Sequence, residues 1–127
     1  MIVAGLGFRR GTSGREIEAA VDLALLRLGL AREKLDALAT LSGKTSEPGV
    51  QEVSRRLALP LIACTPEALR EVEDRIVTVS ARVEAAVGVP SVAEASALVA
   101  AGASSTLRLP RVATASATCA IAEGDGS

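Results

Sequence analysis

Short apolar runs alternate with helical apolar patterns along most of this chain. Ile2–Phe8 is an apolar run interrupted by glycines, and it predicts a buried first strand that ends in a turn. Apolar residues then recur at helical spacing from Ile17 until Gly29. Because Ser13 and Glu16 also have the spacing of a capping box, this pattern predicts the first helix.

The same alternation continues in the middle of the chain. Residues 36–41 are predicted to form the second strand, and the polar residues 42–49 are predicted to form the loop that follows it. Residues 50–57 carry apolar side chains at helical spacing, and Pro60 is expected to end this helix before a third strand at 61–64.

Two further helices are predicted, and the stretch between them is ambiguous. Thr65 is a typical N-cap for a helix that has a proline at its first position. Ser91 and Glu94 repeat the capping-box spacing, and the helix that they start is expected to stop at Gly102. Residues 74–88 combine a strand-like beginning with a helical end, so neither element is predicted there.

The C-terminal part of the chain predicts an antiparallel pair of strands. Residues 107–109 and 118–122 are candidate strands joined by a short connector. With the alternating strands and helices before them, they predict an α/β fold of three layers, α/β/α, with a mainly parallel sheet and an antiparallel C-terminal edge. We expect residues 1–122 to form a single domain and residues 123–127 to be a disordered tail.

Size, charge and aromatic content exclude several classes of protein. The 127 residues fit one domain, since a single hydrophobic core serves chains of about 100 to 150 residues. The net charge of −1 lacks the positive excess that nucleic-acid binding needs, and Phe8 is the only aromatic residue, so base-stacking platforms are missing. Nucleic acid is therefore not an expected partner. No segment resembles a signal peptide or a membrane helix, so a membrane is not an expected partner either, and the cytoplasm is the expected location.

The residue types that usually bind transition metals are scarce. The chain has no histidine, and its two cysteines, Cys64 and Cys119, each lie inside an apolar run rather than in a paired motif. We therefore predict no metal site and interpret both cysteines as buried, reduced thiols. Any chemistry would use carboxylates, lysine, arginine, hydroxyls or backbone amides.

The turn after the first strand is the strongest candidate for a binding site. Glycines between a strand and a helix let backbone amides approach an anion, and arginine grips a carboxylate or phosphate with two hydrogen bonds. The candidate ligand-binding residues of this turn are Gly5, Gly7, Arg9, Arg10, Gly11, Thr12 and Ser13. The alternative interpretation is that the glycines only allow close packing of strand and helix while the arginines are solvated.

Other polar positions are candidates for the same ligand. Lys44 and Glu47 lie in the second loop, which parallel strands bring to the same sheet edge as the turn; the alternative is a solvated ion pair. Ser91 and Glu94 are candidates as well, although capping of the predicted helix is the simpler interpretation. No carboxylate ends the second strand where a dinucleotide needs one, and the glycine turn contains no G-K-[ST] sequence of the Walker type, so no cofactor is predicted. The catalytic residues stay unknown.

Four segments carry a joint resemblance through their order and spacing. They are residues 5–12, Lys44 with Glu47 and Gly49, residues 88–95 and residues 118–122. Together they resemble the CobE/CbiG C-terminal domain family of cobalamin biosynthesis, and the resemblance covers nearly the whole chain. The sequence departs from the family pattern at Phe8, where cysteine is common, and at Arg108 and Arg111, where lysine is usual. The departure at Phe8 argues against a thiol nucleophile in the turn.

The resemblance implies a three-layer α/β domain that works in the construction of the corrin ring. It implies a precorrin or corrinoid intermediate as the small-molecule partner, and an arginine-bearing turn suits the carboxylates of such a molecule. The leading hypothesis is an accessory protein that binds this intermediate. The alternatives are a hydrolase that opens the lactone of a cobalt-precorrin and releases acetaldehyde, and a structural partner of another cobalamin-pathway enzyme.

Overall fold

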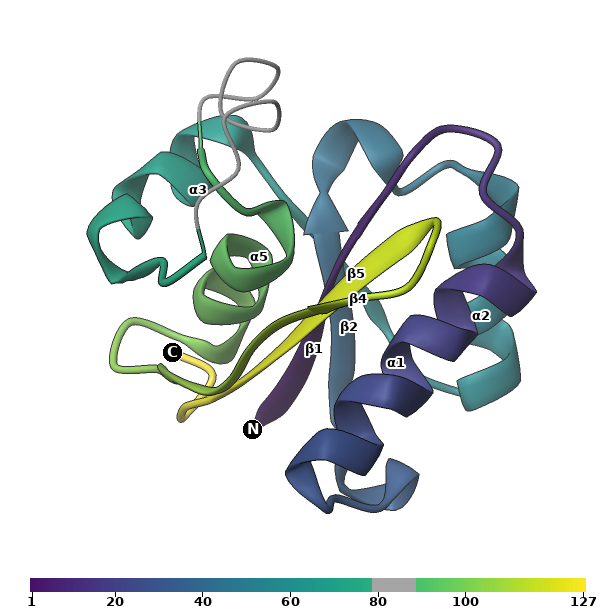
Figure 1. Cartoon of the computed structure of the whole chain (residues 1–127). Coiled ribbons are helices and arrows are strands. Elements are labelled where there is room, and N and C mark those ends of the chain that lie inside the picture. The colour runs from purple at the N-terminus through teal and green to yellow at the C-terminus, as the bar shows by residue number, and fades with distance from the viewer. Residues whose placement is uncertain (79–88) are drawn as a thin grey trace.

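Five strands form one mixed sheet in the part of the chain that the structure describes, residues 1–78 and 89–127 of a computed structural model (Figure 1). The strands are β1 (Ile2–Phe8), β2 (Ala37–Leu41), β3 (Leu61–Cys64), β4 (Thr106–Ala113) and β5 (Ala117–Glu123), in the order β3-β2-β1-β5-β4. β1, β2 and β3 are parallel, whereas β5 is antiparallel to β1 and β4 is antiparallel to β5. The predicted parallel strands and antiparallel C-terminal pair are therefore confirmed.

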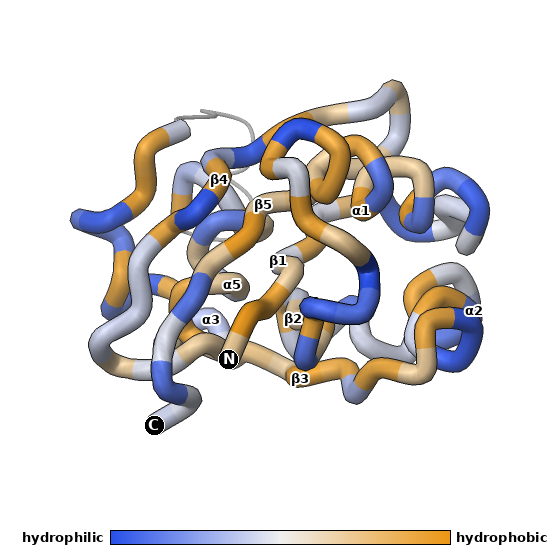
Figure 2. The backbone as a smooth tube through the Cα atoms, turned by 90° about the horizontal axis from the view of Figure 1, so that it is seen from below, coloured by the Kyte–Doolittle hydropathy of each residue, from blue (hydrophilic) through white to orange (hydrophobic). Residues whose placement is uncertain are grey.

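Helices cover both faces of this sheet (Figures 1 and 2). The helices on one face are α1 (Gly14–Leu28) and α2 (Pro48–Leu57), and those on the other face are α3 (Pro66–Glu71) and α5 (Val92–Ala101). Short 3-10 turns lie in the connections, namely η1 (Arg32–Lys34), η2 (Ser42–Lys44) and η3 (Glu73–Arg75). This arrangement is the predicted three-layer α/β fold.

Alternate residues of the central strands supply two hydrophobic cores. Ala4, Leu6 and Leu38 face the core beneath α1 and α2. Their neighbours Val3 and Ala37 point to the opposite face and belong to the core beneath α5, because successive side chains of a strand alternate between faces. The second core is rich in alanine, so its helix and strands approach one another closely.

The closest approach lies at Gly5, in the middle of β1. A Cβ atom at this position would stand 2.0 Å from the Ala93 carbonyl oxygen and 2.6 Å from the Ala97 nitrogen, both in α5. The strand and helix backbones are therefore in direct contact, with no room for a side chain between them. This glycine of the predicted binding turn serves packing.

The helix starts that were predicted from capping signals are confirmed. The Ser13 hydroxyl caps α1 by accepting from the Glu16 amide, and the Glu16 carboxylate accepts in return from the Ser13 amide. Gly29 ends α1 in the left-handed conformation, at φ 71°. The Thr65 hydroxyl caps α3, which has Pro66 at its first position.

α2 and β4 extend beyond the bounds predicted from the sequence. α2 begins at Pro48, before the predicted end of the loop, because proline is favoured at the first helical position. Gly49 then lets this helix pack against the first turn, since a Cβ atom there would stand 2.2 Å from the Thr12 carbonyl oxygen. β4 is longer than residues 107–109, because bulges in its pairing let the strand continue past Pro110.

Backbone hydrogen bonds hold the C-terminal tail in place, contrary to the prediction that it is disordered. Glu123 is the last residue of β5. The Met1 ammonium donates to the Gly124 carbonyl at 2.6 Å, and the Gly126 amide donates to the Ala101 carbonyl at 2.8 Å. The last carbonyls of a helix have no helical partner, so the end of α5 offers an acceptor that the tail uses.

The ambiguous stretch 74–88 is described only in part. Its first residues belong to η3, and residues 79–88 lie outside the described residues. Among the helices that are described, none has the length and apolar character needed to cross a membrane.

We expect the substitution Gly5→Ala to lower the free energy of unfolding by about 3 kcal/mol, because the added Cβ atom overlaps the backbone of α5. Gly43→Ala is the matched control, since nothing lies within 4 Å of a Cβ atom built at Gly43. Urea unfolding followed by circular dichroism measures both variants. An unfolding midpoint of Gly5→Ala equal to that of the wild type would contradict the close packing of β1 and α5.

Candidate functional site

The turn after β1 and the loop after β2 meet at one edge of the sheet. β1 and β2 are parallel neighbours, with Val3 opposite Ala37, so their carboxyl ends lie side by side (Figure 1). The turn consists of residues 9–13, and the loop consists of residues 42–47. Ligands of open α/β sheets bind at this edge, so the contacts between the two segments define the candidate site.

The turn is closed by its own hydrogen bonds. The amide and the hydroxyl of Thr12 both donate to the Arg9 carbonyl, at 3.1 and 2.7 Å. Gly11 adopts φ 84°, a left-handed conformation that glycine adopts without steric cost. The Thr12 hydroxyl is therefore engaged inside the turn, while the side chains of Arg9 and Arg10 are exposed.

Lys44 braces the turn from the second loop. Its Nζ atom donates to the Phe8 carbonyl oxygen at 2.5 Å and lies 5.4 Å from the centre of the Phe8 ring. Burial lowers the pKa of Lys44, the positive charge of Arg10 lowers it further, and the negative charge of Glu47 opposes both effects. Lys44 thus joins η2 to the end of β1 instead of standing as a solvated surface charge.

Glu47 contacts the turn through both of its carboxylate oxygens. Oε1 accepts from the Gly11 amide at 2.7 Å, and Oε2 lies 3.7 Å from the Arg10 Nη1 atom. The Glu47 side chain is 15% exposed, whereas that of Arg10 is 72% exposed. The largely buried Glu47 carboxylate therefore occupies both the Gly11 amide and the Arg10 guanidinium of the turn.

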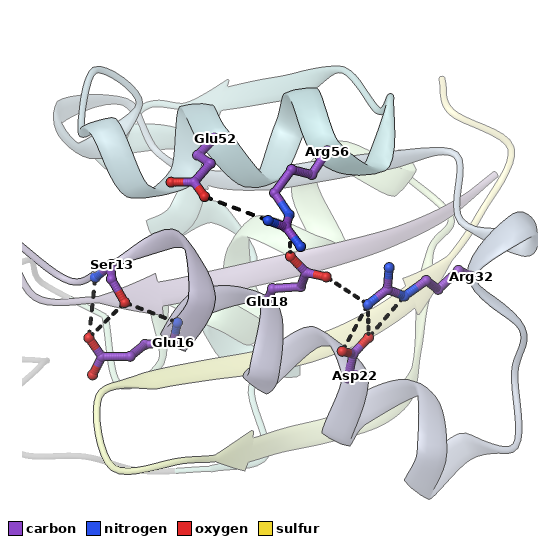
Figure 3. A network of polar contacts seen from close by, with 7 residues as sticks. All are labelled: Ser13, Glu16, Glu18, Asp22, Arg32, Glu52 and Arg56. Atoms are coloured by element: carbon purple, nitrogen blue, oxygen red, sulfur yellow. Dashed lines mark hydrogen bonds and ion pairs between the residues drawn. The ribbon is translucent and has the colours of Figure 1, made fainter.

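The remaining candidates of the turn have internal roles. Gly5 is covered by α5, and a Cβ atom at Gly7 would stand 2.6 Å from Thr118 Oγ1. The Ser13 hydroxyl is engaged with Glu16 in the cap of α1 (Figure 3). The residues that the structure brings together at this edge, named the turn cluster below, are Arg9, Arg10, Gly11, Lys44 and Glu47.

A contact that sequence reasoning missed ties the hairpin of β4 and β5 to the start of α1. The Ser116 hydroxyl donates to a carboxylate oxygen of Glu16. This hydrogen bond lowers the pKa of Glu16, and those from Ser13 lower it further. Pairing of Phe8 with Ala117 carries the hairpin to the same sheet edge as the turn. No local sequence signal links residues that are 100 positions apart.

Glu94 is a buried carboxylate with an internal role. Its Oε1 atom accepts from the Val77 and Thr78 amides at 2.7 and 3.1 Å, and its Oε2 atom accepts from the Arg111 amide at 2.9 Å. The Ser91 hydroxyl accepts from the Glu94 amide at 3.2 Å, so this half of the predicted capping box is confirmed, whereas the carboxylate turns to two other segments. Both side chains are buried and hydrogen-bonded inside the protein, Ser91 as the cap of α5 and Glu94 to the other two segments, so neither is exposed to a ligand.

A bulge in β4 frees one of the donors that Glu94 uses. The register of the β4–β5 ladder shifts between Leu109 and Val112, so the Arg111 amide leaves the ladder and donates to Glu94. Burial raises the pKa of Glu94, but the hydrogen bonds that the carboxylate accepts, with Thr78 the largest contributor, together lower it below its ordinary value. Glu94 is therefore ionised in the neutral pH range.

A second polar cluster fastens α1 to α2 and η1 (Figure 3). Glu18 pairs with Arg56 at 2.9 Å and with Arg32 at 2.8 Å, and Arg32 also pairs with Asp22 at 2.7 Å. Exposed pairs of this kind contribute little stability individually, although a shared carboxylate couples them. A hollow of about 210 Å³ opens beside this network, but both guanidinium groups that line it are already paired.

Both cysteines are free and buried, as predicted. Burial raises the pKa of the Cys64 thiol to about 11 and that of the Cys119 thiol to about 12. Because the thiolate is the reactive form of cysteine, neither residue is suited to act as a nucleophile near neutral pH.

Comparison with known proteins decides the family. A family model described as cobalamin synthesis G C-terminus, CbiG_C, matches residues 2–122. The chain belongs to this family. Protein CobE from Sinorhizobium sp. is 32% identical to it over 121 residues, which are 95% of this chain and 79% of that protein. A crystal structure of CobE, from the cobalamin biosynthetic pathway, matches with a TM-score of 0.91 and 33% identity, over 96% of this chain and 89% of that chain.

Further relatives extend the CbiG_C family. The cobalamin biosynthesis protein chiG from Agrobacterium tumefaciens is 36% identical, with a TM-score of 0.77 over 98% of both chains. A cobalt-precorrin-5A hydrolase from Priestia megaterium is 29% identical over 72 residues, which are 57% of this chain but only 19% of the hydrolase. The resemblance seen in the sequence is confirmed, and the chain is a cobalamin biosynthesis protein of the CobE/CbiG kind.

The substitution Glu94→Gln should destabilise this CbiG_C chain by about 1 to 3 kcal/mol at neutral pH, because a neutral amide replaces a buried carboxylate that accepts three backbone hydrogen bonds. Folding lowers the pKa of Glu94, so its carboxylate stabilises the fold above the ordinary pKa of 4.5 and loses this effect as the pH falls through the folded pKa. The stability difference between wild type and variant should therefore shrink in acid.

Urea denaturation at neutral and acidic pH measures this difference, with Glu67→Gln on the exposed surface of α3 as the control. A difference for Glu94→Gln that stays constant across the acidic range would mean that the ionised carboxylate is not the stabilising form.

Proposed function

We propose that this chain binds a polycarboxylate precorrin or corrinoid intermediate as an accessory factor of cobalamin biosynthesis. The observation that carries the proposal is the turn cluster, in which Arg9 and Arg10 project from a turn that is closed by its own hydrogen bonds, braced by Lys44 and contacted by Glu47. A guanidinium group donates two parallel hydrogen bonds to a carboxylate. Corrin precursors carry many acetate and propionate groups, so one ligand can reach both arginines at once.

The position of the turn cluster in the fold supports the same function. The cluster lies beyond the carboxyl ends of β1 and β2 (Figure 1), which is where open α/β sheets bind their ligands. The start of α1 adds the positive end of a helix dipole. Because the net charge of the chain is only −1, attraction of an anionic ligand must arise from these local groups.

A hydrolase that acts on such an intermediate is the second candidate, favoured by the residues that align with the cobalt-precorrin-5A hydrolase. The alignment spans 19% of that protein, so most of the hydrolase lies outside the comparison. In the turn cluster, the Lys44 amine is the side-chain group that most resembles a nucleophile. It is already engaged, because it donates a hydrogen bond to the Phe8 carbonyl oxygen. Acetaldehyde released from a lactone-bearing cobalt-precorrin by the purified chain would establish the hydrolase.

A purely structural partner of another cobalamin-pathway enzyme is the third candidate, and it needs no bound corrinoid. Visible absorbance distinguishes it from a binder, because a polypeptide does not itself absorb visible light whereas a bound corrinoid does. The absence of Trp and Tyr also keeps the near-ultraviolet region clear. Pigment that remains on the purified chain favours binding or catalysis.

Replacing Arg9 and Arg10 together by alanine should weaken the binding of cobyrinic acid, a corrin with carboxylate side chains, by about 1.5 to 3 kcal/mol for each charged hydrogen bond lost. Both side chains are exposed, so the fold should be kept. The measurement is a titration followed by visible absorbance.

The matched control is the double substitution Arg27→Ala with Arg55→Ala, which removes the same charge from exposed positions of α1 and α2. Cobinamide, in which amides replace the carboxylates, should bind the wild type weakly. Equal affinity of the Arg9 and Arg10 double variant and the wild type for cobyrinic acid would rule out the turn as the binding site.

Lys44 should be coupled energetically to Arg9, because its Nζ atom holds the Phe8 carbonyl directly before Arg9. A double-mutant cycle between Arg9→Ala and Lys44→Ala should give an interaction energy above about 0.5 kcal/mol in cobyrinic acid affinity, since distant sites add within that error. The control cycle uses Lys34→Ala, in η1 before β2. Strict additivity of Arg9→Ala and Lys44→Ala would show that Lys44 does not act on the ligand site.

A further inference from the structure

The donors of the turn cluster already hold a carboxylate that belongs to the chain itself. The Gly11 amide donates to Glu47 Oε1 at 2.7 Å, and the Arg10 guanidinium lies 3.7 Å from Oε2. This amide is not one of the helix amides of α1, which begins at Gly14. A backbone amide and a guanidinium that converge on one carboxylate are a typical way in which proteins bind carboxylate ligands. The structure thus shows a carboxylate in contact with the Gly11 amide and the Arg10 guanidinium.

The Glu47 side chain can leave this place without disturbing the fold around it. Its backbone is held separately, because its carbonyl accepts from the Gln51 amide at 3.2 Å and its amide donates to the Lys44 carbonyl at 3.1 Å. The solvent side of the contact is open, since Gly11 is exposed and nothing lies within 4 Å of a Cβ atom built there. Rotation of one side chain is therefore enough to vacate both donors.

Comparison with Glu94 explains why this exposure matters. Glu94 also accepts backbone amides, but it is completely buried and its donors, such as Val77 and Arg111, come from separate segments. No external group can replace it. Glu47 lies at the rim of the sheet edge, where an incoming carboxylate can take over the hydrogen bond from Gly11 and the ion pair with Arg10 at little net cost.

We propose that Glu47 is an internal stand-in for a ligand carboxylate, and that the Gly11 amide and the Arg10 guanidinium form a carboxylate subsite that a corrinoid side chain occupies by displacing Glu47. The proposal rests on the proposed function and reverses the sequence-based role of Glu47, which becomes a competitor of the ligand. Exchange of one carboxylate for another gains little binding free energy, so a ligand needs further carboxylates that reach Arg9. The subsite therefore selects polycarboxylates over monocarboxylates such as acetate.

The test weakens the stand-in and measures the affinity for two probes, cobyrinic acid and citrate, the latter a small polycarboxylate without a corrin ring. Glu47→Gln keeps the size of the side chain but removes the charge near Arg10, and Glu47→Asp keeps the charge but shortens the reach to Gly11. Both variants should bind both probes about three- to tenfold more tightly than the wild type, because the donors are released for the ligand. Glu33→Gln, an exposed position of η1, removes the same charge and should keep the wild-type affinity.

A second measurement needs no substitution. When either probe is added to the wild type, the Gly11 amide and the Glu47 side-chain carboxyl should change their NMR chemical shifts together, while the Glu33 carboxyl should not. Thermal unfolding shows whether each variant keeps the fold. If a variant at position 47 does not fold, the wild-type NMR spectra alone test whether the ligand displaces Glu47.

The outcomes separate this inference from the proposed function. Tighter binding by Glu47→Gln alone, with Glu47→Asp equal to the wild type, would indicate charge repulsion and overturn the displacement. Weaker binding by both variants would mean that Glu47 supports the ligand, which overturns the inference and leaves the proposed function intact. If citrate behaves as expected while cobyrinic acid binds no variant, the carboxylate subsite stands and the corrinoid function fails. If neither probe binds any variant, both are wrong.

Discussion

The parallel pairing of β1 with β2 is the constraint on which the candidate site depends. It places the ends of the two strands side by side, so that Phe8 meets Lys44 and Gly11 meets Glu47 across 36 positions of sequence in each case. A slip of one residue would turn every side chain of the strand to the opposite face, so the two hydrophobic cores hold this register. The geometry of an exposed turn is therefore set by packing in the interior.

The short distance between α5 and β1 is the second constraint. Small residues allow it, above all Gly5, which leaves the helix and strand backbones in contact. From this position Glu94 reaches the amide of Arg111 in the β4 bulge and the amide of Val77 after η3. Buried amides that lie outside a regular ladder need an acceptor, and one carboxylate supplies it for two segments. Glu94 thus supplies hydrogen-bond acceptors to backbone amides that have no partner in a regular helix or strand.

Glu47 and Glu94 use the same chemistry with opposite consequences. Each carboxylate accepts hydrogen bonds from backbone amides that lie outside regular helix and sheet pairing, Glu47 from one amide and Glu94 from three. Glu94 is sealed in the interior, so its hydrogen bonds are part of the stability of the fold. Glu47 lies beside the exposed Arg10, so its hydrogen bond from Gly11 and its ion pair with Arg10 lie at the surface, where the proposed exchange with a ligand carboxylate would take place. The chain belongs to a cobalamin biosynthesis family, and under the proposed function the ligand that exchanges with Glu47 is a polycarboxylate.

Local signals in the sequence determined the order of strands and helices and most of their ends. The capping box of Ser13 and Glu16, the stop at Gly29 and the cap at Thr65 all depend on residues within one helical turn, so they could be predicted without the fold. The alternation of strands and helices likewise predicted the layers, and the spacing of four segments predicted the family.

The tertiary structure alone decided which partner each of these residues takes. A glycine after a strand suits an anion site and close packing equally well, and only the approach of α5 assigned Gly5 to packing. A glutamate three residues after a cap suits a capping box, yet the bulge in β4 and the exit from η3 drew the Glu94 carboxylate away, whereas Glu16 kept its box. The physical reason is that these contacts join residues far apart in sequence and form only after the sheet register and the helix packing are in place.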